Sequence, residues 1–176
     1  MVLVLRRTAI FIVFVMALAL LAAAMAHSAT PGGREIVAFS GFAPGTIVVK
    51  TEERRLYYVI DNTRALRFPV GVGRIGKAWT GMAQVEGKYV RPAWQPPDEI
   101  RRDHPDLPQV IAGGAANNPM GVAALTLRGG EYAIHGTNRP ASIGGFVSYG
   151  CIRMLNQDIV ELYDLVDVGT PVVVER

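Results

Sequence analysis

Two residues in the C-terminal third of the sequence, Cys151 and His135, are of the types that nucleophilic catalysis uses. A thiol attacks a carbonyl carbon as its thiolate, and a nearby imidazole can take the thiol proton and later give it to a leaving amine. The segment between them, Gly136 to Gly150, is 15 residues long and contains four glycines and one proline. Such a loop can bring its two ends together, so the sequence predicts that both side chains share one site.

The backbone next to the cysteine has further groups that such a site needs. If the turn at Tyr149, Gly150 and Cys151 presents its N–H groups in one direction, they form an oxyanion hole for a tetrahedral intermediate. No acidic residue can be assigned to orient the imidazole, because the nearest ones in sequence, Glu131 and Asp158, cannot be placed. A backbone carbonyl could orient it by accepting a hydrogen bond from one ring nitrogen.

Each of these features also has an ordinary structural interpretation. Cys151 is the only cysteine, so it cannot form an internal disulfide, and it is either buried and inert or retained for its reactivity. A histidine at the end of a strand is commonly a structural residue, and a glycine-rich loop is commonly only a turn. From the residues alone, a catalytic pair and a packed pair both remain open.

The N-terminal 29 residues differ in composition from the rest. Arg6 and Arg7 precede an apolar run from Thr8 to Ala26, and the region up to Ala29 is rich in small residues. This pattern is typical of a secretory signal peptide cleaved near Ala26 or Ala29. The run is also close to the ~20 residues that span a bilayer, so an N-terminal membrane anchor is the alternative. In both cases we expect the remaining chain to be exported to the periplasm or cell envelope.

The sequence divides into a leader at 1–29, an N-terminal segment at 30–45 and one domain at 46–176. Two of the 18 basic residues lie in the leader, which leaves 16 against 15 acidic ones. A body so close to neutral argues against nucleic acid as a partner. Outside the leader, the histidines are His104 and His135, without metal-ligand spacing, and no nucleotide motif is present. We therefore expect no metal and no cofactor.

Runs rich in β-branched and aromatic residues predict a mainly β domain. The first three runs form a meander that turns at Asp61–Asn62, and a later run delivers His135 at its end. Residues 74–122 are irregular and predict long loops around one or two short elements, including a helical turn near 97–102. The predicted strands are residues 46–51, 55–60, 65–70, 123–127, 131–134 and 170–174.

One helix is predicted after Cys151. Asn156 fits its N-cap, Asp158 its first turn, and Gly169 the position just past its end. Apolar residues recur along it at helical spacing, at Leu155, Ile159, Leu162 and Val166. The predicted fold is a mostly β domain with one packed helix near its C-terminus and long loops.

The segments Ile134-His-Gly-Thr and Ser148-Tyr-Gly-Cys-Ile-Arg-Met resemble the signature of the L,D-transpeptidase (YkuD-type) catalytic domain. In that family a His-Gly is followed by a spacer of similar length and then by Ser/Thr-His-Gly-Cys, an apolar residue and Arg or Asn. The resemblance covers most of residues 46–174 and is weakest between 78 and 112. It implies a β-sandwich or meander of the L,D-transpeptidase type.

The resemblance implies an enzyme whose partners are peptidoglycan stem peptides, both as donors and as acceptors. Cys151 attacks the carbonyl between an L-centred diamino acid and the following D-alanine, which leaves, and the acyl group passes to an amine of another stem peptide. His135 is the implied general base and acid, oriented by the main-chain carbonyl of Gly136. The backbone N–H groups of Tyr149, Gly150 and Cys151 are the implied oxyanion donors.

Other positions of the signature carry supporting roles or depart from the family. The resemblance associates Arg153 with ordering the site or meeting a substrate carboxylate. We expect Ser148 to be a hydrogen-bonding loop residue, and Thr137 to order the site or contact substrate. Tyr149 replaces the second histidine most often found there, and a phenol with a pKa near 10 cannot act as a base at pH 7. The usual upstream Thr-Pro-Thr-Gly is altered to Trp79-Thr-Gly-Met.

The sequence leaves several functions open. Water as acceptor would make the chain an L,D-carboxypeptidase, and a protein lysine would make it a ligase that attaches envelope proteins to the wall. A non-catalytic peptidoglycan-binding domain is the alternative from another class. Trp79 and Trp94 lie in the loop region, where we expect ordinary packing rather than substrate capture.

Overall fold

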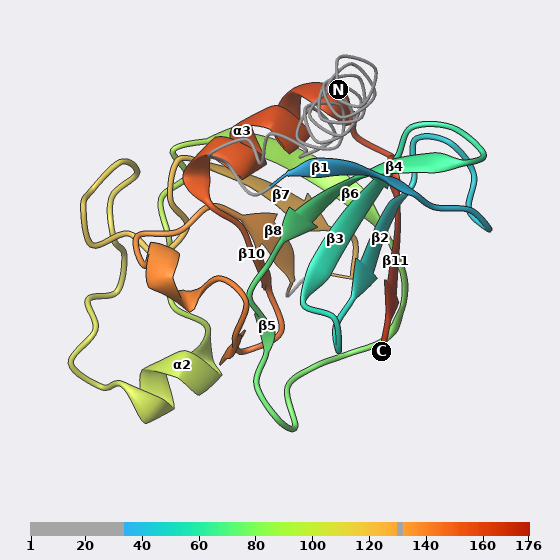
Figure 1. The fold of residues 1–176 in the computed structure, drawn as a ribbon. Coiled ribbons are helices and arrows are strands. Elements are labelled where there is room, and N and C mark those ends of the chain that lie inside the picture. The colour runs from blue at the N-terminus through green and yellow to red at the C-terminus, as the bar shows by residue number, and fades with distance from the viewer. Residues whose placement is uncertain (1–33, 130–131) are drawn as a thin grey trace, which may run out of the picture.

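The computed structural model describes residues 34–129 and 132–176, so the predicted leader lies outside the described part. In that part, nine strands form one sheet in the order β1-β4-β3-β2-β11-β6-β7-β8-β10, and β5 pairs with β9 (Figure 1). The prediction of a mainly β domain with one main helix is therefore confirmed. The elements are β1 (Glu35–Ala38), β2 (Ile47–Lys50), β3 (Arg55–Val59), β4 (Arg64–Pro69), β5 (Val72–Gly73), β6 (Gly81–Val90), α2 (Asp98–Asp103), β7 (Ala123–Leu127), β8 (Ala133–His135), the 3-10 turn η1 (Pro140–Ser142), β9 (Phe146–Ser148), β10 (Ile152–Arg153), α3 (Asn156–Leu165) and β11 (Pro171–Glu175).

The predicted meander forms one half of the sheet. Strands β2, β3 and β4 pair antiparallel in chain order, and β11 returns to pair parallel with β2. The run Ile47-Val48-Val49 is buried on both faces, because Ile47 and Val49 enter the main core while Val48 enters a second cluster with Tyr57. A strand covered on both faces needs such a continuous apolar run. β1, which lies in the N-terminal segment, joins this half by pairing with β4.

The two halves of the sheet are joined by β6, a strand of ten residues inside the region predicted to be loop. That prediction was wrong here. β6 pairs antiparallel with β11 on one side and with β7 on the other, with a register shift between Val85 and Gly87. Val85 is its one fully buried residue, so β6 shows no apolar alternation that a sequence pattern could reveal. Its position is fixed by backbone hydrogen bonding on both sides.

The second half of the sheet, β7, β8 and β10, carries the predicted site and is covered by α3 (Figure 1). Ile159 and Leu162 of α3 are completely buried against a core that includes Ile134 and Ile152. Burying the two helix side chains contributes about 3–6 kcal/mol as an upper estimate. This packing fixes the strands from which Cys151 and His135 project.

Two details of α3 differ from the prediction. Leu155 occupies the N-cap position without a side-chain cap, whereas Asn156 is already helical and uses its side chain elsewhere. The helix ends at Leu165, and Gly169, at φ +94°, belongs to the turn that leads into β11. Asp158 lies in the first turn as expected, where burial raises its pKa to about 6.

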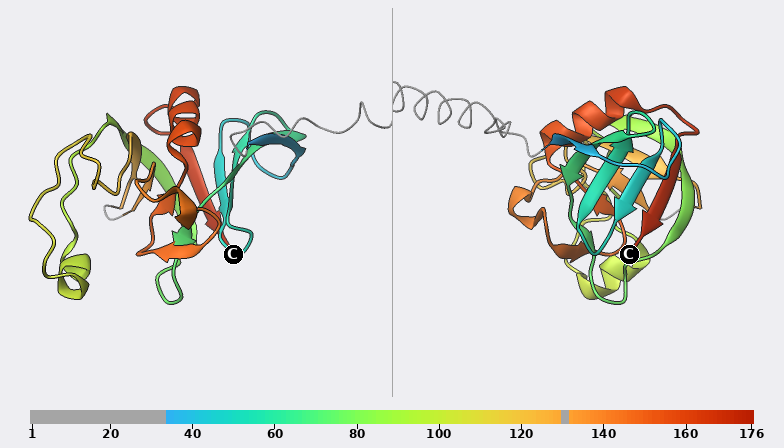
Figure 2. Two further views of the ribbon diagram at one scale, coloured as in Figure 1. Left: turned by 60° about the vertical axis from the view of Figure 1, so that its left-hand side comes forward. Right: turned by 45° about the vertical axis from the view of Figure 1, so that its right-hand side comes forward.

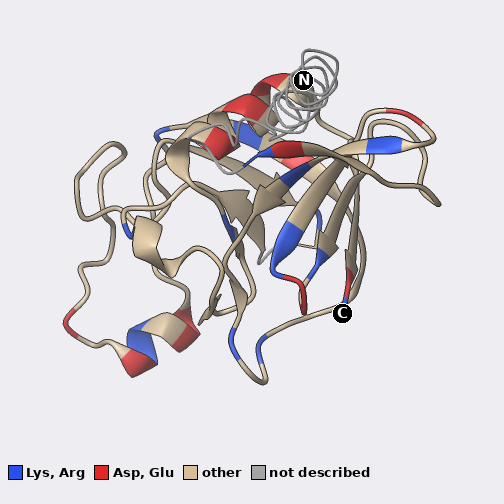
Figure 3. Cartoon of the chain, in the orientation of Figure 1, with Lys and Arg blue, Asp and Glu red and all other residues tan. Residues whose placement is uncertain are grey.

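The short helix α2 confirms the helical turn predicted near 97–102. It begins with two acidic residues, carries two arginines in its last turn and ends on the acidic Asp103, so red segments flank a blue one in Figure 3. Figure 2 shows α2 and its flanking loops standing away from the sheet. Ion pairs from Arg74 to Asp103 and from Lys77 to Glu99 connect it to the loop between β5 and β6. None of the helices in the described ranges is long and apolar enough to cross a membrane.

Candidate active site

Parallel pairing of β8 with β10 places Cys151 and His135 on one face of the sheet. In this pair Ile134 lies opposite Ile152, and His135 lies opposite Arg153. Side chains alternate along a strand, so the two isoleucines enter the core while His135 and Arg153 share the other face with the residue just before β10, Cys151. The positive charge of Arg153 acts on the pKa of both His135 and Cys151.

The imidazole of His135 is buried, with 4% of the residue exposed, and is held by main-chain groups. Its Nδ1 lies 2.7 Å from the carbonyl oxygen of Gly136. Because a carbonyl can only accept, Nδ1 carries the proton and Nε2 keeps the basic lone pair. Burial, together with the charge of Arg153, lowers the pKa of His135 to about 4, although hydrogen bonds to the Gly136 and Pro119 backbone oppose this. The ring is therefore neutral at pH 7.

Cys151 is half-buried, and its thiol is not part of a disulfide. Burial raises its pKa, while a hydrogen bond from the backbone of Ala133 and the charge of Arg153 act in the opposite direction. At neutral pH the site therefore combines a neutral thiol with a neutral imidazole. Such a pair suits a mechanism in which the imidazole removes the proton as the substrate is attacked, rather than a preformed ion pair.

The turn that presents Cys151 is closed by Ser148. The Ser148 hydroxyl donates to the carbonyl of Cys151 at 2.6 Å and accepts the N–H of Gly150 at 3.1 Å. Gly150 has φ +124°, and a Cβ there would meet the ring of Tyr132 at 2.3 Å. Only glycine fits both the backbone conformation and the close approach of the ring. Ser148 thus acts on the shape of the turn.

The three N–H groups predicted to hold an oxyanion are not equivalent. That of Gly150 already donates to Ser148, so it can reach an oxyanion only by giving up that bond. The N–H groups of Tyr149 and Cys151 have no acceptor among the described residues. The free donors of the turn are therefore those of the nucleophile itself and of the tyrosine.

Asn156 orders the loop that follows His135, a role that the sequence did not indicate. Its side-chain oxygen accepts the N–H of Thr137 at 2.9 Å and that of Val122 at 3.4 Å. A Cβ on Gly136 would lie 2.3 Å from the same oxygen, so glycine is needed there. Thr137 is buried and its hydroxyl accepts the N–H of Arg139 at 2.9 Å. It orders the loop, and its burial leaves little of its surface exposed.

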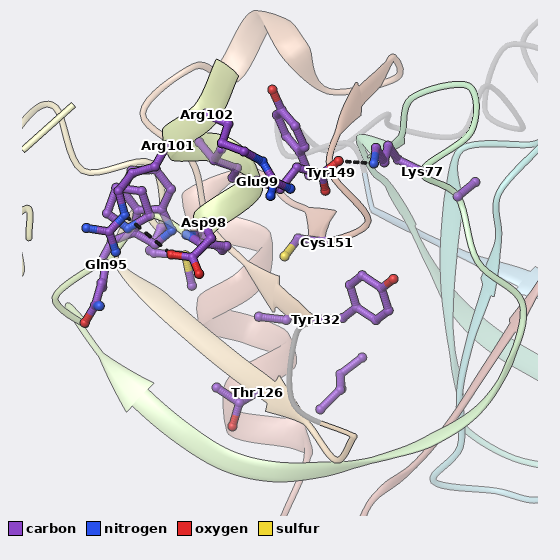
Figure 4. A pocket seen from close by; sticks show the side chains of 18 of the residues that line it. Lys77, Gln95, Asp98, Glu99, Arg101, Arg102, Thr126, Tyr132, Tyr149 and Cys151 are labelled. Atoms are coloured by element: carbon purple, nitrogen blue, oxygen red, sulfur yellow. Dashed lines mark hydrogen bonds and ion pairs between the residues drawn. The ribbon is translucent and has the colours of Figure 1, made fainter. Parts of the chain in front are cut away.

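Two clefts meet at Cys151. The larger, of about 1090 Å³, runs below α2 along β6 and β7, and the smaller, of about 510 Å³, lies toward the loop 138–147. Figure 4 shows the Cys151 sulfur in the larger cleft, between Tyr132 and Tyr149. Both clefts are bounded by the same four residues, Trp94, Ile100, Tyr149 and Cys151.

The smaller cleft is cationic. Arg139 and Arg153 line it together with Arg74 and His104, and none of its lining residues is acidic. Arg153 donates to the hydroxyl of Ser142 at 3.0 Å, but its buried Nε has no partner in the described structure. Burial and the charge of Arg139 lower the pKa of Arg153. The sequence analysis missed Arg139. Its position in the loop between His135 and Cys151 could have indicated a place near the site.

Tyr149 connects the site to α2. Its hydroxyl donates to Asp103, and this bond raises the phenol pKa. The guanidinium of Arg74 lies 3.9 Å from the ring centroid and also bonds Asp103 at 3.0 Å. The phenol is therefore a donor and a packing surface at neutral pH, without basic character.

Comparison with known sequences places this chain in a family. The model of the L,D-transpeptidase catalytic domain (YkuD) matches residues 44–174. The probable L,D-transpeptidase YbiS of Escherichia coli K12 is 41% identical over 135 residues, which is 72% of this chain and 43% of the relative. The probable L,D-transpeptidase ErfK/SrfK of the same strain is 42% identical, with 72% and 42% covered. The chain thus spans less than half the length of these curated relatives.

Solved structures show the same fold. An L,D-transpeptidase from Mycobacterium smegmatis aligns with a TM-score of 0.60 at 19% identity, over 74% of this chain and 58% of that one. A Brucella melitensis chain named as a probable carnitine operon oxidoreductase aligns with a TM-score of 0.55 at 36% identity, over 80% and 92%. Because the family model covers residues 44–174, which are more than half of the chain and include Cys151 and His135, the chain belongs to the L,D-transpeptidase catalytic-domain family.

Proposed function

We propose that this chain is a cysteine L,D-transpeptidase that acts on peptidoglycan stem peptides through Cys151. One observation carries the proposal. A thiol that opens into two clefts shares a sheet face with a buried imidazole, and the Gly136 carbonyl holds that imidazole in the tautomer a general base requires. The names of the relatives, together with the family match, supply the reaction class.

The first half-reaction follows from this geometry. Nε2 of His135 takes the thiol proton while the sulfur of Cys151 attacks the carbonyl between the L-centred diamino acid and D-alanine. The carbonyl electron pair moves to oxygen, where the N–H groups of Cys151 and Tyr149 stabilise the negative charge. Collapse of this intermediate breaks the C–N bond, and D-alanine leaves with the proton from the imidazolium. An acyl-enzyme thioester remains on Cys151.

The second half-reaction needs an acceptor on the other side of the thioester. An amine from a second stem peptide attacks the acyl carbon, His135 removes its proton, and the thiol is regenerated. Two clefts that meet at Cys151 support a peptide acceptor over water, since a donor and an acceptor can be held at the same time. The L,D-carboxypeptidase and the wall ligase remain the alternatives that share the acyl-enzyme.

The cationic cleft supports a substrate that carries carboxylates. Stem peptides have a free carboxylate at the D-alanine end and others along the chain. Arg139 and Arg153 line the smaller cleft without an acidic partner among the described residues, and Arg153 has an unpaired Nε. A bound carboxylate would satisfy that donor with a charge-assisted hydrogen bond. We assign Arg153 to a substrate carboxylate as well as to ordering the loop through Ser142.

The cellular place of this reaction follows from the N-terminal sequence. A signal peptide, or the alternative N-terminal anchor, directs the domain to the periplasm or cell envelope, where peptidoglycan lies. The substitution of tyrosine at position 149 alters the cleft wall and leaves His135 as the base, so we expect activity with a changed acceptor preference.

The proposal is tested by acylation with a carbapenem. Imipenem is bound in the solved structure of a related transpeptidase, which makes it a suitable probe. Intact-mass spectrometry is expected to find one imipenem adduct on the wild type and none on Cys151→Ala. No adduct on the wild type would favour the non-catalytic peptidoglycan-binding domain. An equal adduct on the variant would remove Cys151 from the mechanism.

A second measurement separates the acceptors. Purified peptidoglycan tetrapeptides are incubated with the wild type and with Cys151→Ala, and the products are resolved by chromatography and mass spectrometry. Cross-linked dimers identify a transpeptidase, and shortened monomers alone identify a carboxypeptidase. Unchanged tetrapeptides, with an enzyme that does react with imipenem, would exclude this donor peptide.

A further inference from the structure

We infer that Trp79 is a positioning residue for the oxyanion hole, because its indole N–H fixes the peptide unit that carries the N–H of Cys151. The inference rests on the proposed function, since an oxyanion forms only if Cys151 attacks a carbonyl. Trp79 stands where the family usually has part of its Thr-Pro-Thr-Gly stretch, so this contact belongs to a position at which the chain departs from the signature.

The contact is direct. Nε1 of Trp79 donates to the carbonyl oxygen of Gly150 at 3.0 Å. The indole stacks on the ring of Tyr132, with ring centroids 4.9 Å apart and planes inclined by 8°. Tyr132 in turn occupies the space beside Gly150 in which a side chain would otherwise lie. Trp79 also packs against the main core, so the expected packing role is present, with a hydrogen bond to the catalytic turn in addition.

Peptide geometry converts this contact into control of the oxyanion donor. The C=O of Gly150 and the N–H of Cys151 belong to one planar unit, and no peptide bond in the described chain is cis. In a trans unit the two groups point in opposite directions. Holding the carbonyl toward Trp79 therefore aims the N–H of Cys151 away from the indole, and the hydrogen bond at the carbonyl also polarises that N–H.

The other side of the nucleophile is held independently. Ser148 donates to the carbonyl of Cys151 and accepts from the N–H of Gly150. The two peptide units on either side of the Cys151 Cα are thus each fixed by one side-chain donor, Trp79 on the first and Ser148 on the second. The N–H of Cys151 is left without an acceptor in the described structure and with a fixed direction.

This arrangement distinguishes two reactions of the same thiol. Attack of Cys151 on the β-lactam carbonyl of imipenem forms a C–S bond and moves an electron pair to oxygen, before the ring C–N bond breaks and its nitrogen takes the proton from His135. Alkylation by iodoacetamide forms a C–S bond at carbon and expels iodide, without any oxyanion. Trp79 should therefore matter to the first reaction and not to the second.

The test compares Trp79→Phe with the wild type in both reactions. Phenylalanine keeps a ring to stack on Tyr132 but lacks the N–H. We expect the acylation rate at saturating imipenem to fall about three- to tenfold, as for the loss of one orienting hydrogen bond. The imipenem concentration at half-saturation and the rate of iodoacetamide alkylation should not change.

Tyr58→Phe is the matched control, because it removes one side-chain hydrogen bond to a backbone carbonyl, that of Leu165 at 3.1 Å, away from the clefts. Both of its rates should equal the wild-type rates. If Trp79→Phe does not fold, Trp79 is replaced by 3-benzothienylalanine, in which sulfur takes the place of the indole N–H at nearly equal size. The same selective loss is expected there.

Three outcomes are decisive. Unchanged acylation in a folded Trp79 variant would overturn the inference while leaving the proposed function intact. An equal loss in acylation and alkylation would overturn it too, because Trp79 would then act on the thiol or on the fold. A wild type that is alkylated but never acylated would instead contradict the proposed function itself.

Discussion

The two walls of the larger cleft are held in place by different kinds of contact. On the wall that carries Cys151, the backbone is fixed by partly or fully buried hydrogen bonds to side chains. Ser148 makes them in the turn, and Asn156 makes them in the loop after His135. On the opposite wall, α2 is connected to the rest of the domain by ion pairs such as Arg74–Asp103, in which both side chains are 43% exposed. Under the proposed function, the first wall presents the reacting groups and the second encloses the substrate.

This difference has physical consequences. A buried donor or acceptor that loses its partner cannot turn to water, so each contact on the catalytic wall enforces one geometry. Exposed ion pairs are screened by salt and replaced by water at little cost, so the wall at α2 can adjust. The molecule thus combines a rigid wall around Cys151 with a wall at α2 that can adjust its position.

The largest expected effect comes from removing the base on the rigid wall. His135→Ala should lower the rate of imipenem acylation at pH 7 about 10²- to 10⁴-fold, because the thiol of Cys151 then has no group to take its proton. The rate of the variant should rise with pH as the thiol ionises by itself, whereas the wild type should be nearly flat between pH 6 and pH 8. Stopped-flow acylation across pH measures both. A variant as fast as the wild type at pH 7 would exclude His135 as the base.

The pKa of His135 also predicts the acid side of the profile. Wild-type acylation should fall by half near pH 4, where the buried imidazole becomes protonated. The free energy of unfolding should also fall as the pH is lowered. In the unfolded chain the histidine has a pKa of 6.5, so it takes up a proton at a higher pH than in the folded chain. Acid therefore favours unfolding from about pH 6.5 down to about pH 4. Asp158, with its pKa raised to about 6, has the opposite effect on stability, because acid then favours the folded state. The contribution of His135 is therefore isolated by measuring the free energy of unfolding in urea across pH, and by subtracting the values of His135→Ala from those of the wild type.

The next largest effect concerns the loop support. Asn156→Ala leaves the N–H of Thr137 without its acceptor, and weakens the contact to Val122. We expect a loss of about 1–3 kcal/mol in the free energy of unfolding, the usual cost of an unpaired buried group. Asn138→Ala is the control, because its 3.5 Å contact to the Ala116 carbonyl is exposed. Denaturant unfolding that finds both variants equal would contradict a supporting role for Asn156.

The same contrast explains what could be predicted from the sequence. Strands β2, β3, β4, β7 and β11 each contain at least two buried apolar residues, and the prediction found each of them within two residues of its bounds. The prediction missed β6 because most of its residues are exposed and show no apolar pattern. Its strand conformation is fixed by pairing with β11 and β7. β5 and β10 consist of two residues each, too few for any periodic signal.

The site shows the same limit at the level of single side chains. Cys151 and His135 could be named from residue type and from the family signature, because their chemistry is intrinsic to them. The roles of Asn156 and Trp79 depend on which backbone group lies opposite, at sequence separations of 19 and 71 residues. No local pattern encodes such contacts, and Asn156 was read as a helix cap because asparagine is common there.

The smallest expected effect is on the adjustable wall, where Asp103→Asn removes the charge that holds Arg74 and accepts the Tyr149 hydroxyl. The rate of imipenem acylation should stay the same, while the donor-peptide concentration at half-saturation should change by about twofold. Its dependence on salt between 0.1 and 1 M NaCl should become weaker, because only the arginines of the smaller cleft then contribute to it. The phenol pKa of Tyr149 should fall toward its ordinary value, because the bond to Asp103 is the main cause of its rise, and absorbance titration of the tyrosines measures this.

The control is Asp61→Asn, which removes an exposed Asp–Arg pair outside both clefts and should leave the donor-peptide concentration at half-saturation unchanged. A large loss of acylation in Asp103→Asn would mean that α2 is coupled to the nucleophile through Tyr149, and the division into a rigid and an adjustable wall would fail at that residue.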